Sequence, residues 1–317
     1  MKRIFLLRAY GDFIVALQSL VNSSDRSHYE IIASAHHRAL YDALPASIIP
    51  ANLSIRFVDW GIRKPLLRAF TDRHILHPET LQELTALREF LRANPLEPGS
   101  DFVENTHRKW LLSLATGHQF TAIADEGLVY KAYQEFFKLG GGDASPVAPV
   151  AGSGPVVTEV AAVETVVPVD DSVAPVATTP VTAKKILILP SARITKRNIP
   201  LTIVNTLNEQ HSAKGDEVTV AYFNAGASDG VTDGAVVAAA SVATTGANFV
   251  AAGYTNFNEL IQLILQSDLV YGADSLPIHL SYLLQKPHYI IFPDGGSHQF
   301  FTPYALQHKM YKTFNQF

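Results

Sequence analysis

The sequence predicts an α/β protein made of two doubly wound domains that face each other across a cleft. Apolar strands alternate with helices in residues 1–138 and again in residues 184–317, and a segment of different composition separates the two blocks. Alternation of this kind predicts a parallel sheet with helices on its faces. A ligand of such a protein lies at the carboxyl ends of the strands.

The elements of the first block follow in order. Residues 3–8 and 30–34 are short apolar runs and are predicted strands, with a helix over residues 13–21 between them. Pro78 opens a further helix, because proline suits the first helical turn. The leucines of that helix are expected to share one face: Leu81, Leu84, Leu87 and Leu91. We expect residues 1–138 to form the first domain.

The middle block, residues 139–183, has a different composition. It has three glycines at residues 140–142, holds six of the 18 prolines, and has five Asp and Glu but no Lys, Arg or aromatic residue. A segment without large side chains or periodicity cannot build a core of its own. We therefore predict a linker or a mobile insertion here.

The second block, residues 184–317, repeats the alternation. Predicted strands cover residues 185–189, 217–223, 269–271 and 289–292, and predicted helices cover residues 202–210 and 256–266. Asn256 is the expected cap of the latter helix, with Glu259 at capping-box spacing. A last helix follows Ser275, with Pro277 in its first turn.

Three segments are expected to face the cleft, and the first is Gly11-Asp12, where the first strand meets the first helix. A carboxylate there can take a proton from a substrate hydroxyl. Taken alone, the segment is more typical of a helix cap at Asp12 and a tight turn at Gly11.

The second segment follows the strand at residues 185–189. Residues 190–197 contain three cations and two hydroxyls, among them Ser191, Arg193 and Lys196. Arginine offers a fork and lysine a point charge to phosphate oxygens, so this loop fits a diphosphate clamp. A solvated basic loop is the alternative reading.

The third segment runs from Gly272 to His279 and starts a helix at the carboxyl end of a strand. Its free backbone N–H groups make a natural seat for a phosphate, with Asp274 and Ser275 beside it. His279 fits either this site or the interior of the protein.

Together these segments resemble glycosyltransferase family 9, the ADP-heptose:lipopolysaccharide heptosyltransferases. The resemblance rests on Arg8 to Asp12, on residues 190–200, on the Gly-Ala-Asp-Ser-Leu-Pro-Ile-His run at 272–279, and on residues 105–112. It implies the GT-B fold, two Rossmann-like domains of which residues 1–138 bind the acceptor and residues 184–317 bind the nucleotide sugar.

The resemblance also implies a mechanism of inverting sugar transfer. Asp12 would deprotonate an acceptor hydroxyl, which attacks the anomeric carbon opposite the leaving diphosphate, while Arg8 and Gly11 would contact the acceptor. The donor diphosphate would be held by four residues: Ser191, Arg193, Lys196 and Ser275. Asp274 would hold the donor sugar, and His279 would touch the donor or brace the loop.

The implied partners are a nucleotide-sugar donor, such as an ADP-linked heptose, and a saccharide or glycolipid acceptor such as a lipopolysaccharide core. No tightly bound cofactor or metal is expected. The close histidine pairs, His36-His37 and His74-x-x-His77, are read as structural or surface residues. A net charge of −4 gives no reason to expect nucleic acid as a partner.

We expect a cytoplasmic protein, because the N-terminus lacks a signal-peptide pattern and no apolar run reaches eighteen residues. Peripheral contact with the inner face of the membrane would follow from a lipid acceptor. Residues 63–73 are the best candidate for an acceptor-facing or membrane-facing patch, with an ordinary amphipathic helix as the alternative reading. A catalytically inactive GT-B-shaped protein that binds nucleotide sugars is the alternative function. A nicotinamide dehydrogenase fits less well, because no Gly-x-Gly-x-x-Gly follows either first strand.

Overall fold

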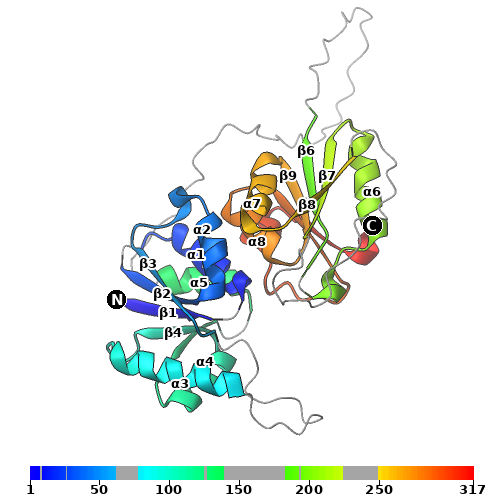
Figure 1. The fold of residues 1–317 in the computed structure, drawn as a ribbon. Helices are drawn as coiled ribbons and strands as arrows, with labels where there is room; N and C mark the ends of the chain where they lie inside the picture. The colour runs from blue at the N-terminus through cyan, green and yellow to red at the C-terminus, as the bar shows by residue number, and fades with distance from the viewer. Residues whose placement is uncertain are drawn as a thin grey trace, which may run out of the picture.

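The computed structural model describes most of the chain. The described residues are 1–7, 9–25, 27–61, 78–124, 127–138, 183–192, 194–223 and 249–317. They form two α/β halves, here called the first half (residues 1–138) and the second half (residues 184–317), each built on its own sheet (Figure 1). Nearly all of the predicted middle segment, 139–183, lies outside the described residues.

The sheet of the first half is parallel throughout its described strands, in the order β3-β2-β1-β4-β5. Its strands are β1 (Lys2–Leu6), β2 (Tyr29–Ser34), β3 (Leu53–Val58), β4 (Asp101–Asn105) and β5 (Thr121–Ala124). Its helices are α1 (Tyr10–Val21), α2 (Arg38–Ala43), α3 (Pro78–Ala93), α4 (Thr106–Thr116) and α5 (Val129–Lys138).

The described strands of the second half also run parallel, in the order β11-β10-β9-β6-β7-β8. They are β6 (Lys185–Leu189), β7 (Glu217–Phe223), β8 (Phe249–Tyr254), β9 (Leu269–Ala273), β10 (His288–Phe292) and β11 (Tyr311–Thr313). The helices are α6 (Leu201–Ser212), α7 (Phe257–Gln266), α8 (Leu276–Leu283) and α9 (Pro303–Gln307).

Both strand orders contain a point where the direction of winding reverses. In the first sheet it lies between β1 and β4, and in the second between β6 and β9. Ligands of open α/β sheets bind beyond the carboxyl ends of the strands at such switch points. The three segments singled out in the sequence follow β1, β6 and β9, so each of them lies at a switch point.

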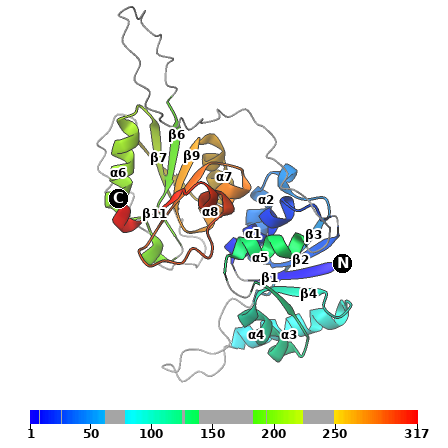
Figure 2. The same ribbon diagram turned by 180° about the vertical axis from the view of Figure 1, so that it is seen from behind.

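Helices fill the space between the two sheets. Helices α1 and α2 of the first half lie beside α7 and α8 of the second, whereas α3 and α4 cover the opposite face of the first sheet (Figures 1 and 2). One cluster of buried apolar side chains runs through this layer and includes Phe13 and Ile14 of α1 and Ile278 of α8. The halves therefore share a core rather than touching only at a polar surface.

Two elements differ from the sequence prediction. Helix α1 begins at Tyr10, three residues earlier than expected, and the Tyr10 ring packs edge-on against Phe257 of α7 at 5.2 Å between centroids. In α3, Leu84, Leu87 and Leu91 are buried but Leu81 is 41% exposed. A three-residue step falls about 60° short of a full helical turn, which rotates Leu81 away from the face of the other three.

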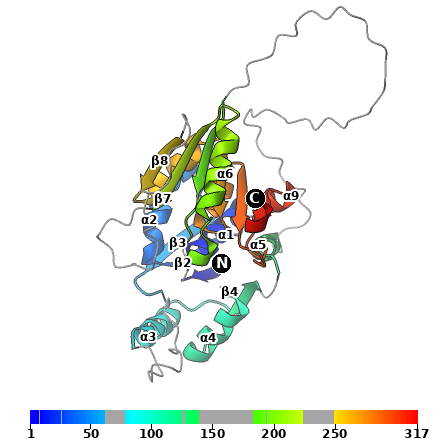
Figure 3. The ribbon, with the colours of Figure 1, turned by 90° about the vertical axis from the view of Figure 1, so that its right-hand side faces the viewer.

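Helix α7 starts as predicted, with a small variation in its cap. The Asn256 side chain accepts the Glu259 N–H at 3.0 Å. The Glu259 carboxylate reaches back to accept the N–H of Thr255, at 2.6 Å, and the side-chain amide of Asn256, at 2.8 Å. Among the described residues, no helix is long and apolar enough to cross a membrane. In the view of Figure 3, α6 lies in front of the second sheet and α1 and α2 lie behind it, so α6 covers the face of this sheet that is turned away from the first half.

Candidate active site

The start of α1 positions the predicted base. Ala9 is the N-cap residue, in extended backbone, so Asp12 is the third residue of the helix and not its cap. A carboxylate in the first turn interacts favourably with the positive end of the helix dipole. The side chain of Asp12 is half-buried, and its negative charge adds to burial in raising the pKa of Tyr133 on α5. Arg8, the predicted acceptor-binding cation, lies outside the described residues.

Gly11 is the second residue of α1 and has no positive φ, so no tight turn requires a glycine there. A methyl group on its Cα would lie 3.9 Å from Cδ2 of His279 on α8. The first turns of α1 and α8 therefore face each other, with room for one added carbon atom between Gly11 and the ring of His279. This contact brings the predicted acceptor segment and the predicted donor segment together.

The start of α8 is organised by Ser275, which is the N-cap residue with extended backbone. Its hydroxyl accepts no helix N–H. It donates instead to the carbonyl oxygens of Ala273, at 3.2 Å, and Ser191, at 3.4 Å. Side-chain capping therefore does not compete for the amides at this helix start, which suits an anion. Pro277 has no N–H, and the N–H of Ile278 donates to the carbonyl oxygen of Ser275 at 3.1 Å, so an anion would lie at the very first residues of the helix. The bond to Ser191 ties the loop after β6 to the same place.

An ion pair joins these two loops. Arg197, in the short 3-10 helix Thr195–Arg197 after β6, places Nη1 at 3.3 Å from Oδ2 of Asp274. Asp274 is buried, and burial raises the pKa of its carboxyl while the Arg197 guanidinium opposes the rise. Arg197 was not among the predicted site residues, although it stands in the same basic run.

The other cations of the predicted clamp differ in placement. The side chain of Lys196 is exposed on the loop after β6, where it is accessible to a ligand. Arg193 lies outside the described residues. Of the predicted donor residues, Ser275 thus contacts Ser191 directly, and Asp274, which precedes Ser275 in the chain, pairs with Arg197 of the loop after β6. Lys196 lies on the surface of the same loop.

His279 lies in the interior, with 4% of its surface exposed. Its Nδ1 shares a hydrogen bond of 2.9 Å with the hydroxyl of Tyr130 on α5, a residue of the first half. Burial, with Coulombic repulsion from the protonated form of His288 and from Arg197, lowers the pKa of His279 to about 4, so the ring is neutral at pH 7. Tyr130 was missed in the sequence, where only its place on the buried face of an amphipathic helix marked it.

The histidines offer no metal centre in the part of the chain that can be described. Within the described residues, no group of three or more His, Cys, Asp or Glu side chains is placed to hold a metal ion. His36 and His37 stack on each other beside Tyr10, with ring centroids 3.8 Å apart. His74 and His77 lie outside the described residues.

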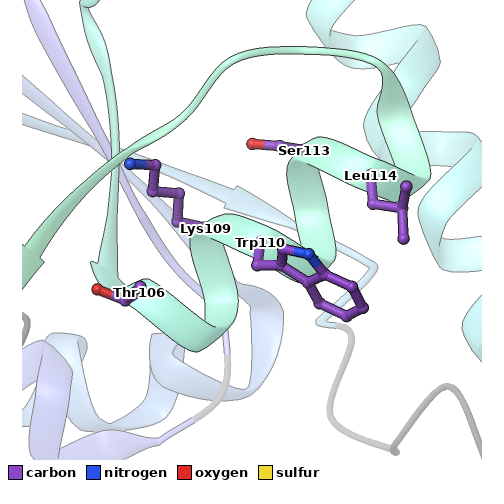
Figure 4. Close-up of a pocket in the computed structure, with 5 residues that line it drawn as sticks. All are labelled: Thr106, Lys109, Trp110, Ser113 and Leu114. Atoms are coloured by element: carbon purple, nitrogen blue, oxygen red, sulfur yellow. The ribbon is translucent and has the colours of Figure 1, made fainter.

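A pocket of about 460 Å³ lies elsewhere, on the outer side of α4 (Figure 4). It is lined by Thr106, Lys109, Trp110, Ser113 and Leu114. All five side chains come from a single helix, and none is a predicted site residue. The convergence of α1, α8 and the loop after β6 therefore defines the candidate site better than this hollow does.

The architecture belongs to a known class. Two α/β halves, each with a parallel sheet, that pack together through the helices between their sheets are typical of the GT-B fold. Solved structures with this fold match the chain. E. coli heptosyltransferase WaaC with ADP matches with a TM-score of 0.57 at 12% identity, over 99% of this chain and 92% of that chain.

Two further solved structures match in the same way. E. coli ADP-heptose lps heptosyltransferase II has a TM-score of 0.53 at 14% identity, over 99% of this chain and 90% of that one. A glycosyltransferase family 9 protein from Veillonella parvula DSM 2008 has a TM-score of 0.55 at 13% identity, over 98% and 85%. A comparison with curated proteins found no match.

The family follows from the sequence of the second half. The model of glycosyltransferase family 9 (heptosyltransferase) matches residues 161–315, which include β6, α8 and the loop of Ser191 to Arg197. The chain is a heptosyltransferase-like glycosyltransferase with a family 9 domain, and its activity is transfer of a sugar from a nucleotide sugar. The resemblance and the GT-B fold expected from the sequence are confirmed.

Proposed function

We propose that this glycosyltransferase moves a heptose-like sugar from a nucleotide diphosphate sugar to a saccharide acceptor of the lipopolysaccharide-core kind, with inversion at the anomeric carbon. The observation that carries the proposal is the meeting of two switch points. The first turn of α1, with Asp12, faces the first turn of α8, with Asp274 and Ser275 next to it.

Asp12 acts as the general base in this mechanism. Asp12 lies in the first turn of α1, just after the central strand β1, and its side chain is half-buried. A half-buried carboxylate can contact a bound hydroxyl while it is partly shielded from water. The acceptor hydroxyl gives its proton to Asp12 while its oxygen forms a bond to the anomeric carbon. The bond from that carbon to the diphosphate oxygen breaks on the opposite face.

The leaving diphosphate gains negative charge as that bond breaks. The backbone amides at the start of α8 and the ammonium group of Lys196 stabilise this charge, together with Arg193 and the hydroxyls of Ser191 and Ser275. Arg197 has a different task here. It neutralises Asp274 from the side of the loop and so holds that carboxylate ready for the hydroxyls of the donor sugar.

The donor is proposed to be ADP-linked. One similar structure contains ADP, and another similar structure is titled E. coli heptosyltransferase WaaC with ADP-2-deoxy-2-fluoro heptose. The acceptor is proposed to lie against Gly11 and Arg8, on the first half. No step in this scheme needs a resident cofactor, because fixed charges and amides perform the charge stabilisation.

The test is substitution of the base. Purified Asp12→Asn protein is mixed with ADP-heptose and a lipid-free core saccharide, and ADP release is followed. We expect kcat to fall about 100-fold or more, which is the usual contribution of a positioned base. Asp42→Asn is the matched control, since Asp42 is an exposed carboxylate on α2.

Three results would overturn the proposal. Equal activity of Asp12→Asn and the parent would remove Asp12 from the mechanism. A product whose anomeric configuration, read by NMR coupling constants, is the same as that of the donor would exclude the inverting displacement. A parent that binds ADP-heptose yet releases no ADP with any saccharide would favour the inactive binding protein.

A further inference from the structure

The hydrogen bond between Tyr130 and His279 crosses from one half of the protein to the other. Tyr130 lies on α5 in the first half and is 1% exposed, and His279 lies on α8 in the second half and is 4% exposed. A neutral His279 makes this bond without a charge to solvate. Buried polar groups of this kind are costly to leave unpaired.

Helix α5 is itself fixed at both ends. Near its C-terminus, the hydroxyl of Ser23, just after α1, donates to the carbonyl oxygen of Phe137 at 2.9 Å. At its start, the N–H of Val129 donates to the carbonyl oxygen of Gln299, from the second half, at 2.9 Å. Between these points α5 packs along α1. The Tyr130 hydroxyl therefore projects from a helix whose position relative to Asp12 is set by packing.

His279 is one turn into α8, directly after the segment that carries Asp274 and Ser275. On its other side, the ring edge lies opposite Gly11, so it fills the space between the first turns of α1 and α8. A shift of the ring would carry the start of this eight-residue helix with it. The ring thus sets the spacing between the two parts of the proposed site.

We propose that Tyr130 is a positioning residue for sugar transfer, which through its bond to His279 holds the start of α8 in register with Asp12. This inference rests on the proposed function for its catalytic consequence. It also assigns His279 to the support of the loop, in place of contact with the donor sugar. Neither residue touches the reacting atoms in this scheme.

Tyr133 provides a matched control on the same helix. It lies one turn after Tyr130 and is fully buried, yet its hydroxyl has no hydrogen-bond partner among the described residues. Tyr130→Phe and Tyr133→Phe therefore remove the same atom from the same helix at the same depth. Only the first of them breaks a bond between the two halves.

The first experiment needs no ligand and so does not depend on the proposed function. Amide hydrogen exchange is measured for the free protein and both variants. We expect Tyr130→Phe to raise the exchange rates of the first two turns of α8 about tenfold, with β1 and β6 unchanged, and Tyr133→Phe to stay within twofold of the parent. Equal exchange in the two variants would overturn the inference.

Substitutions of His279, the other partner of the hydrogen bond, distinguish loss of this bond from a general loss of folding. The amide of asparagine can occupy the position of the histidine Nδ1, whereas leucine offers no polar atom there. We expect His279→Asn to keep exchange in α8 closer to the parent than His279→Leu does. The opposite order would show that volume, and not the bond to Tyr130, fixes this helix.

The second experiment measures the catalytic consequence with ADP-heptose and a core saccharide. We expect Tyr130→Phe to raise the KM for ADP-heptose about tenfold and to lower kcat, while the KM for the acceptor changes less than threefold. Tyr133→Phe should match the parent. An inactive parent whose α8 still loosens in Tyr130→Phe would contradict the proposed function and leave the positioning role standing. An active parent with identical variants would contradict the positioning role alone.

Discussion

Arg197 and Asp274 form an ion pair that links the loop after β6 to the start of α8, with 3.3 Å between Nη1 and Oδ2. The carboxylate is buried, and the guanidinium is about one-third exposed. The pair therefore joins the two strands that flank the switch point of the second sheet. Its neighbour Lys196 has its side chain in solvent, so the two cations of one short segment are expected to behave differently on substitution.

Arg197→Ala is expected to lower the free energy of unfolding by about 1–2 kcal/mol, because it leaves Asp274 buried without its partner and the exposure of Arg197 reduces the full cost. Transfer activity should fall as well. Lys196→Ala is the control, with stability unchanged within about 0.5 kcal/mol and a raised KM for the donor. Urea unfolding and steady-state kinetics separate the two effects, and equal stability of both variants would contradict the assigned roles.

The buried histidines predict acid sensitivity. Burial lowers the pKa of His279 and of His288 to about 4. A histidine with a depressed folded-state pKa contributes stability that is present above about pH 6.5 and is lost as the pH falls toward 4. For each histidine, this lowering of the pKa corresponds to a loss of about 3 kcal/mol in the free energy of unfolding as the pH falls from 6.5 to 4.

We therefore expect the free energy of unfolding, measured with urea, to fall steeply between pH 6.5 and pH 4. His288→Asn should flatten the slope, since asparagine does not take up a proton. His308→Asn, at an exposed position, should leave the slope as in the parent. A parent whose stability stays constant over this range would show that neither ring is buried in the neutral form.

Alanine substitutions at two glycines near the site are expected to have opposite effects on the free energy of unfolding. A Cβ on Gly272 would lie 2.8 Å from Cδ1 of Ile278, a fully buried side chain, whereas a Cβ on Gly11 would meet only an ordinary contact at 3.9 Å. Gly272→Ala should lower the free energy of unfolding by about 1–3 kcal/mol through overpacking. Gly11→Ala should be neutral or stabilising by about 0.5–1 kcal/mol, because alanine favours the helix.

Activity adds a second outcome to the Gly11 variant. If the acceptor lies against Gly11, as proposed, Gly11→Ala should raise the KM for the acceptor while thermal unfolding shows an intact fold. An unchanged KM would remove Gly11 from the acceptor site. A melting temperature below that of the parent would contradict the ordinary van der Waals contact expected between the new methyl group and His279.

The far end of the first sheet has a buried ionic cluster with no part in the site. Arg3 is 1% exposed, and its Nε donates to Oδ1 of Asp101 at 2.6 Å, while Nη2 donates to Oδ2 at 3.0 Å. Arg3→Met is expected to lower the free energy of unfolding by about 3 kcal/mol, because the buried carboxylate of Asp101 loses its guanidinium partner and keeps the contact with Nε2 of His118, at 2.7 Å. The double variant with Asp101→Leu should recover part of the loss. Greater damage in the double variant than in Arg3→Met would contradict this account.

Much of the fold could be read from the sequence. Strands β6 and β7 have the predicted bounds, and the Gly272 to His279 segment forms the predicted strand end and helix start with Pro277 in its first turn. These features depend on local properties, namely runs of apolar residues, capping side chains and the fixed φ of proline. The division into domains at 138 and 184 stays a prediction, as do the roles of the site residues.

Other features had no signal in the sequence. Nothing near Tyr130 distinguishes it from Tyr133, which has the same helical face and the same burial. The partner that separates them, His279, is 149 residues away. Arg197 was visible as one of several cations, yet only the path of the loop decided that it would pair with Asp274 while Lys196 would face solvent.

The sequence by itself determined the alternation of strands and helices, the GT-B class and the family, because strand and helix periods and the motif residues are local properties of the chain. The tertiary structure alone decided how α1 meets α8, which tyrosine bonds to His279, and that both halves share one apolar layer. These are contacts between residues far apart in the chain. Their geometry depends on how two complete sheets pack their helices together, which no local pattern encodes.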